Sequence, residues 1–61
     1  MKRTVLVKHL QQRGCQLLRE GAWHSVYENP ANGRTSTVPR HTEIDNMLAR
    51  RIYRDLDIPP P

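Results

Sequence analysis

One histidine of this sequence lies where it could transfer protons, between a predicted glycine turn and a predicted strand. His24 stands three residues after Gly21 and three before Tyr27. Histidine is the side chain whose unperturbed pKa allows proton transfer near neutral pH. Cleavage of RNA needs a proton removed from the 2′-hydroxyl and a proton delivered to the leaving oxygen, and a histidine can do either. We therefore take His24 as the candidate catalytic residue, with a hydrogen-bonded histidine at the core edge as the alternative.

Cationic and aromatic side chains near this histidine could bind the phosphates and bases of RNA. Arg19 and Arg40 could stabilise the negative charge that develops on the phosphoryl oxygens. His41 could supply a second proton-transfer group, and Trp23 could stack on an unpaired base. For Arg40 and His41 the alternative is an ordinary polar loop before a helix, and for Trp23 it is a ring that only covers exposed sheet surface.

The net charge points to a nucleic acid or an acidic protein as partner. Ten lysines and arginines stand against six acidic residues, for a formal net charge of +4. Most of the cations are arginines, whose planar guanidinium suits phosphate. Arg50, Arg51 and Arg54 form a basic patch on the last predicted helix. They could contact phosphate or an acidic partner, or they could be a solvated face that only aids solubility.

Several other chemistries lack the residues that they need. The three histidines have no short ligand-pair spacing, and Cys15 is the only cysteine, which excludes a disulfide and a cysteine zinc cluster. No apolar run approaches the roughly 18 residues of a membrane span. The apolar stretch at residues 5–7 is too short for a signal peptide. We therefore expect a cytoplasmic protein whose RNA cleavage needs neither a metal nor another cofactor.

The hydrophobic pattern predicts a helix, three strands and a second helix. Apolar stripes predict helices over residues 4–13, with Thr4 as N-cap and Gly14 at the C-terminus, and from about 45 to 55. Thr42 and Asp45 have capping-box spacing, although Asp45 or Asn46 could equally be the N-cap. Alternation between clusters of turn residues predicts strands at 15–19, 23–28 and 34–38.

Such a three-stranded antiparallel meander has one face to bury, which two amphipathic helices can cover. The α-β-β-β-α order is that of the α+β fold of double-stranded-RNA-binding domains, with both helices packed on one face of the sheet. The 61 residues allow a single domain, 1–61, ending in a short proline tail at 59–61. If Val26 points to the core, Trp23, Ser25 and Tyr27 lie on the opposite face and His24 lies on the core side.

An ordered set of short motifs resembles the HicA-type toxins of type II toxin–antitoxin systems. The set extends over roughly residues 6–59, and its members are Gly14 after the first helix, 20–27, Asn29-Pro30, Gly33-Arg34, 38–41, Glu43-Ile44, 48–52 and Asp55-Leu56. The resemblance implies a small ribonuclease that cleaves messenger RNA and arrests translation. It implies His24 as catalytic histidine and a HicB-type antitoxin that covers the active site.

Two adjacent positions depart from the family pattern. HicA-type toxins often have Gly-Gly-Asn or Gly-Ser before the histidine, whereas this chain has Ala22 and Trp23. The bulky Trp23 could alter the access of substrate or the contact with the antitoxin.

Two other functions stay open at this point. The first is a non-catalytic RNA-binding module of the same fold, which would depend on Arg50, Arg51 and Arg54 rather than on His24. Its binding would weaken steeply with salt. The second is a protein-interaction subunit, which would bind an acidic partner and have no affinity for RNA.

Overall fold

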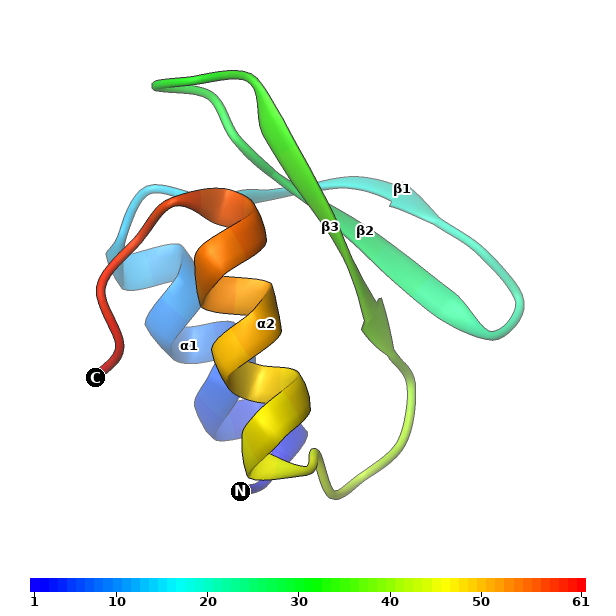
Figure 1. Ribbon diagram of the computed structural model, residues 1–61. Coiled ribbons are helices and arrows are strands. Elements are labelled where there is room, and N and C mark those ends of the chain that lie inside the picture. Colours follow the sequence, from blue (N-terminus) through cyan, green and yellow to red (C-terminus); the bar gives the residue numbers. More distant parts are fainter.

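The computed structural model describes residues 1–61, and its elements follow the order α-β-β-β-α (Figure 1). The elements are α1 Arg3–Gln12, β1 Gln16–Glu20, β2 His24–Asn29, β3 Arg34–Pro39 and α2 Asn46–Leu56. The predicted order is confirmed, and each predicted boundary lies within one residue of the observed one. The local periodicities of the sequence are therefore sufficient to place the elements.

The three strands form one open antiparallel sheet in the order β1-β2-β3. The register between β1 and β2 shifts between Leu17 and Arg19, which is a bulge in the edge strand β1. Both helices lie on the same side of the sheet, so its other face is left open (Figure 1). This arrangement confirms the predicted α+β fold of the double-stranded-RNA-binding-domain type.

The helix ends differ in part from the predicted caps. Thr4 was expected as the N-cap of the first helix, but α1 begins at Arg3 and its N-cap position is Lys2, whose side chain makes no capping bond. Lys2 is extended and pairs with Glu43, ahead of α2, in an isolated antiparallel bridge directly before the helix. The predicted glycine after α1 is confirmed, since Gly14 has a φ of 85°.

The second helix is capped by Asp45, one of the two residues proposed for that position. The Asp45 carboxylate accepts a hydrogen bond of 3.4 Å from the Met47 backbone N–H. The expected capping box with Thr42 is therefore wrong, because Asp45 is the N-cap itself rather than the third residue of the helix. At the other end Asp57 adopts the left-handed conformation and closes the helix.

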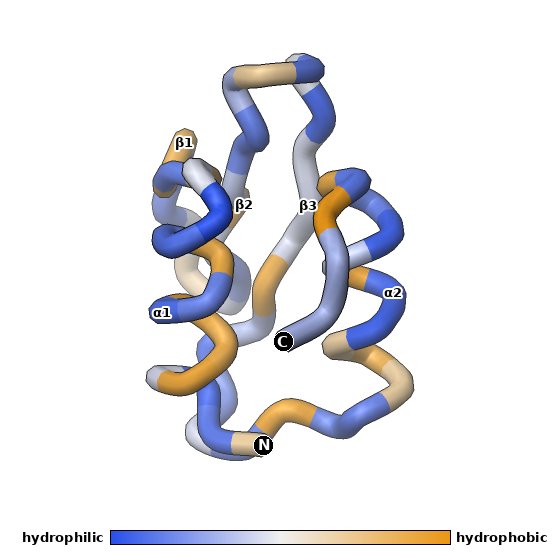
Figure 2. The backbone as a smooth tube through the Cα atoms, turned by 90° about the vertical axis from the view of Figure 1, so that its left-hand side faces the viewer, coloured by the Kyte–Doolittle hydropathy of each residue, from blue (hydrophilic) through white to orange (hydrophobic).

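The core lies between the two helices and the covered face of the sheet. It consists of ten buried side chains, Leu6, Leu10, Cys15, Tyr27, Val38, Ile44, Ala49, Ile52, Tyr53 and Leu56. In Figure 2 hydrophobic positions recur along both helices, and the C-terminal segment descends between them. There the Pro59 carbonyl lies 2.8 Å from His9 Nε2, and the His9 ring packs edge-on against Tyr53.

The prediction of which face of β2 is buried was wrong. Ser25, Tyr27 and Asn29 face the core, whereas His24 is exposed and Val26 is half-buried on the open face. The structure buries the larger apolar surface of Tyr27 in preference to that of Val26. The two polar side chains beside it are tolerated because both are hydrogen-bonded, as buried polar groups must be.

Candidate functional site

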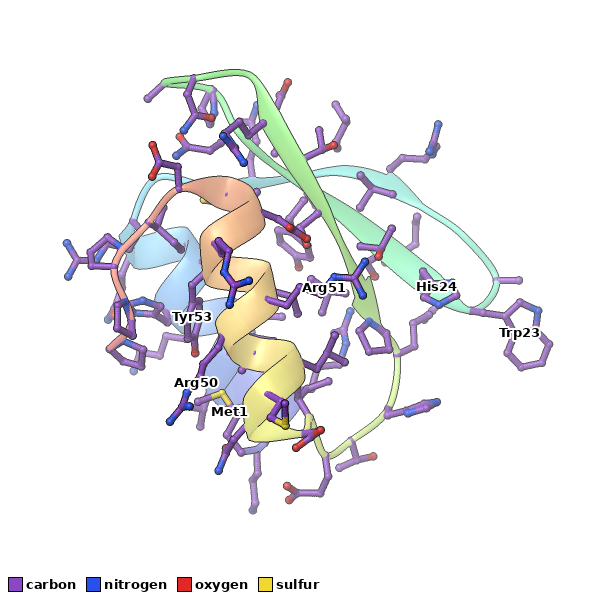
Figure 3. The ribbon with its side chains drawn as sticks, in the orientation of Figure 1. Met1, Trp23, His24, Arg50, Arg51 and Tyr53 are labelled. Carbon is purple, nitrogen blue, oxygen red and sulfur yellow. The ribbon has the colours of Figure 1, made fainter.

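His24 begins β2 and presents its imidazole on the open face of the sheet (Figure 3). In the antiparallel register it stands opposite Pro39, the last residue of β3. The side chain is exposed and forms no hydrogen bond or ion pair with the rest of the chain. The alternative of a hydrogen-bonded histidine at the core edge is therefore wrong. The imidazole is available to a molecule that lies on the open face.

The turn between β1 and β2 holds the backbone of this histidine. The Gly21 N–H donates a 2.8 Å hydrogen bond to the His24 carbonyl. A Cβ atom on residue 21 would lie 3.0 Å from the same oxygen, tighter than most Cβ contacts, so the close approach favours glycine here. The backbone of His24 is thus fixed from the side of β1 by a contact that a larger residue would displace.

Arg40, which follows β3, contributes to the same turn. Its backbone N–H donates to the Trp23 carbonyl at 3.3 Å, and its Nη1 donates to the Gly21 carbonyl at 3.1 Å. Sequence analysis predicted Arg40 only as a phosphate contact. The structure adds a role in holding the turn, and because a guanidinium carries five N–H donors, others stay available beside His24.

Three further predicted residues lie at or next to this corner of the sheet. Arg19 pairs with Val26, which shares the open face with His24, so Arg19 occupies the neighbouring position on that face. Trp23 projects from the β1–β2 turn with 79% of its surface exposed (Figure 3). His41 is exposed directly after Arg40. The fold thus gathers a histidine, an aromatic ring and two arginines at one sheet corner, with a second histidine next along the chain.

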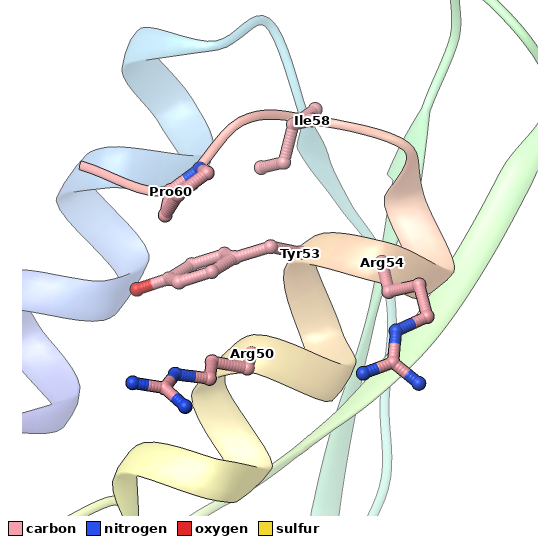
Figure 4. Close-up of a pocket in the computed structure, with 5 residues that line it drawn as sticks. All are labelled: Arg50, Tyr53, Arg54, Ile58 and Pro60. Carbon is pink, nitrogen blue, oxygen red and sulfur yellow. The ribbon is translucent and has the colours of Figure 1, made fainter.

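The predicted arginines of α2 do not belong to this corner. Arg50 lies on the far side of α2 from Trp23 (Figure 3). It lines a cavity of about 230 Å³ together with four other residues, Tyr53, Arg54, Ile58 and Pro60 (Figure 4). Arg51 is exposed and leaves α2 on another side from Arg50 (Figure 3). The predicted RNA-binding residues therefore do not form one surface: Arg50 and Arg51 leave α2 on different sides, away from the residues around His24.

The structure also reveals a polar group that sequence analysis missed, on the covered face behind His24. Arg3 Nε donates to the Pro39 carbonyl at 2.9 Å, and Arg3 Nη2 donates to Ser25 Oγ at 2.9 Å. Ser25 Oγ in turn donates to the Glu20 carboxylate. No local sequence signal points to this group, because its members come from α1 and from all three strands.

Three further findings concern possible metal ligands, ionisable groups and membrane-spanning helices. No three histidine, cysteine or acidic side chains lie together in a group that could hold a metal ion. Burial raises the pKa of the Cys15 thiol and of the Tyr53 hydroxyl, and both of these groups belong to the core rather than to the sheet corner. None of the helices is both long and apolar enough to cross a membrane.

An open three-stranded sheet with two helices on one face, and an exposed histidine among cationic and aromatic residues on the other, defines a small basic α+β protein of the double-stranded-RNA-binding-domain type. Residues 5–58 match the family described as the HicA toxin of bacterial toxin–antitoxin systems. Since the match covers most of the chain, the protein belongs to the HicA toxin family and is the toxin of a toxin–antitoxin pair. The resemblance found in the sequence is confirmed. Neither a curated protein nor a solved structure matched the chain.

Proposed function

We propose that this toxin is a metal-independent endoribonuclease that cleaves messenger RNA and thereby arrests translation in the cytoplasm, with His24 as general acid or base. The observation that carries the proposal is the position of the imidazole. It is exposed on the open face, has no partner within the chain, and lies among Arg19, Trp23 and Arg40. A side chain without a structural partner, placed among phosphate-binding groups, suits proton transfer to a bound RNA.

The chemistry needs only the RNA and a proton carrier. The 2′-oxygen attacks the adjacent phosphorus while its proton passes to a base, and the 5′-oxygen of the next nucleotide leaves with a proton from an acid. The products are a 2′,3′-cyclic phosphate and a 5′-hydroxyl end. His24 takes one of these two proton transfers, and His41, exposed directly after Arg40, is the candidate for the other. Arg19 and Arg40 stabilise the charge on the phosphoryl oxygens.

The other predicted contacts follow from the same placement. Trp23 offers an exposed ring on which an unpaired base stacks beside the cleaved bond. Membership of the family implies a cognate antitoxin, and we propose a HicB-type protein that covers this sheet corner. Covering the corner would neutralise the toxin because it would exclude RNA from His24.

Cleavage of messenger RNA in excess EDTA, by wild type beside His24→Ala, tests the proposal. We expect the wild type to cleave and the variant to lose about 100-fold or more of the rate, which is the usual contribution of a general acid or base. The variant should keep the wild-type circular dichroism spectrum and melting temperature, because the exposed imidazole makes no contact that supports the fold. Full activity in His24→Ala, or loss of wild-type activity in EDTA, would contradict the proposal.

The exposure of Trp23 favours one second candidate, a module that binds RNA without cutting it. The same experiment separates the two if binding is measured beside cleavage. Binding by wild type and His24→Ala without cleavage by either would support the module. Loss of that binding on substitution of Arg50 and Arg51, with a steep dependence on salt, would place the RNA on α2 instead of the sheet corner.

A further inference from the structure

The backbone that carries His24 lies at a weak point of the sheet. In an antiparallel pair, residues joined by ladder hydrogen bonds alternate with residues that are not. Arg40 N–H donates to the Trp23 carbonyl, so the next pair along, His24 and Pro39, is one that the ladder does not join. Proline has no N–H to donate, and β3 is an edge strand, so the Pro39 carbonyl has no strand partner on its outer side.

A single arginine from α1 compensates for this weakness from the covered face. Arg3 binds the Pro39 carbonyl through Nε and Ser25 Oγ through Nη2, each at 2.9 Å. These are the register partner of His24 and the residue that follows it in β2. Ser25 is fully buried, and its hydroxyl donates onward to Glu20, its register partner at the end of β1. One guanidinium therefore links the ends of all three strands directly behind the imidazole.

We propose that Arg3 is a positioning residue for His24, acting through Ser25 and Pro39 and not through contact with RNA. The inference rests on the proposed function, in which His24 transfers a proton. A guanidinium is a planar fork with fixed donor directions, so it can hold two acceptors on different strands at once. Its removal would leave the fold intact but let the His24–Pro39 pair move at the edge of the sheet. Small displacements of a reacting group are costly to the chemical step.

The decisive variant is Arg3→Lys, because it keeps the charge but replaces the fork with a single nitrogen. We expect kcat for RNA cleavage to fall about tenfold to 100-fold while KM changes less than about twofold. Arg13→Lys, an exposed residue at the other end of α1, is the matched control and should leave both constants unchanged. A purely structural role would lower the melting temperature and the folded fraction but not kcat per folded molecule.

Two substitutions extend the test along the hydrogen-bonded chain. Ser25→Ala removes the hydroxyl without adding volume and should reproduce the loss of kcat at unchanged KM. Glu20→Gln keeps an oxygen acceptor for Ser25 and should retain nearly the wild-type kcat. If Arg3→Lys does not fold, Ser25→Ala decides the question. Wild-type kcat in folded Arg3→Lys or in Ser25→Ala would overturn the inference, and so would a rise in KM alone, which would indicate direct contact with RNA.

Amide hydrogen exchange makes this test independent of catalysis. The Ser25 and Val38 amides, which form the next hydrogen-bonded pair of the β2–β3 ladder, should exchange faster in Arg3→Lys than in wild type, and at the wild-type rate in Arg13→Lys. If the wild type cleaves no RNA, the proposed function fails, but the exchange rates still decide whether Arg3 holds His24 in place. Unchanged exchange at both amides would overturn the positioning role, whatever the activity.

Discussion

At the scale of single residues, two positions at the start of β2 show the reverse of the exposure that side-chain polarity suggests. Trp23, the largest apolar side chain of the chain, is 79% exposed, while Ser25 two residues later is fully buried. Ser25 is stable in the core because it both accepts and donates a hydrogen bond there. Trp23 has no such compensation in water, since its surface touches little of the protein. We propose that the exposed Trp23 ring binds an RNA base, because it lies beside the candidate catalytic histidine.

A substitution at Trp23 should therefore affect binding and leave the fold unchanged. We predict that Trp23→Ala weakens binding of single-stranded RNA by about tenfold or more, which corresponds to the loss of one base stacked on an aromatic ring. The free energy of unfolding should change by less than about 0.5 kcal/mol, as for other exposed positions. Fluorescence anisotropy with labelled RNA and urea unfolding measure the two effects.

Met47→Ala is the matched control for Trp23→Ala, because Met47 is a comparably exposed apolar residue on α2. It should change neither RNA binding nor stability. Equal loss of affinity in both variants would show that the effect of Trp23 is not specific to the sheet corner.

At the scale of elements, the hairpin between β2 and β3 closes the C-terminal end of α2. Asn29 Nδ2 and Asn32 Nδ2 both donate to the Leu56 carbonyl, at 2.9 and 3.1 Å. Arg34 Nε donates to the Asp55 carbonyl at 2.7 Å. The last carbonyls of a helix have no partner within it, so these contacts satisfy groups that α2 cannot satisfy alone. The turn therefore fixes the position of the helix as well as the pairing of the strands.

The buried member of this group should be the more important for stability. We predict that Asn29→Ala lowers the free energy of unfolding by about 1–3 kcal/mol, because it removes a buried hydrogen bond to the Leu56 carbonyl and the acceptor of the Ala31 N–H. Asn32→Ala removes a similar bond at an exposed residue, where water can replace it, and should cost less. Urea unfolding of the two variants makes the comparison. An equal or larger loss in Asn32→Ala would contradict the assignment.

At the scale of the whole molecule, a small core is supplemented by contacts between distant parts of the chain. Only ten hydrophobic residues are buried. The N-terminal ammonium donates to the Ile44 carbonyl at 2.9 Å, and the C-terminal segment is held at Pro59 by His9. A domain of this size buries little surface and is marginally stable. Burial raises the pKa of two of the ten core residues, Cys15 and Tyr53, which links the stability of the whole domain to pH.

The pH dependence follows from the direction of these two shifts. Burial raises the pKa of Cys15 and of Tyr53 in the folded state, so the unfolded chain releases both protons at a lower pH than the folded chain does. At a pH below the pKa values of the unfolded chain, the two groups make a constant contribution to the free energy of unfolding. The free energy of unfolding falls as the pH rises through those values, above about pH 9. We predict a lower urea midpoint at pH 10 than at pH 7.

Cys15→Ala supplies the control for this pH effect. The variant should be less stable than wild type at pH 7, because it loses a buried side chain. Its further loss between pH 7 and pH 10 should be smaller than that of wild type, because one of the two ionisations has been removed. An unchanged or larger pH-dependent loss in Cys15→Ala would exclude the thiol as a cause.

The order and approximate bounds of the elements could be predicted from the sequence, and so could the family. Helical and strand periodicities are local, and turn residues such as Asn32 and Gly33 mark the ends of strands without reference to the rest of the chain. Local patterns also predicted that His24 lies beside Trp23 and near Arg40. The predicted β2–β3 hairpin brings the segment with Trp23 and His24 and the segment with Arg40 to the same end of the sheet.

Only the tertiary structure decided which face of β2 enters the core and which residues accompany His24. Alternation separates the two faces of a strand but does not say which is buried when each carries one apolar side chain, here Val26 and Tyr27. The choice depends on Arg3, which satisfies Ser25 from another element, and on Leu56, which accepts from Asn29. Because such partners are distant in the sequence, the burial of a polar residue becomes favourable only once the chain has folded around it.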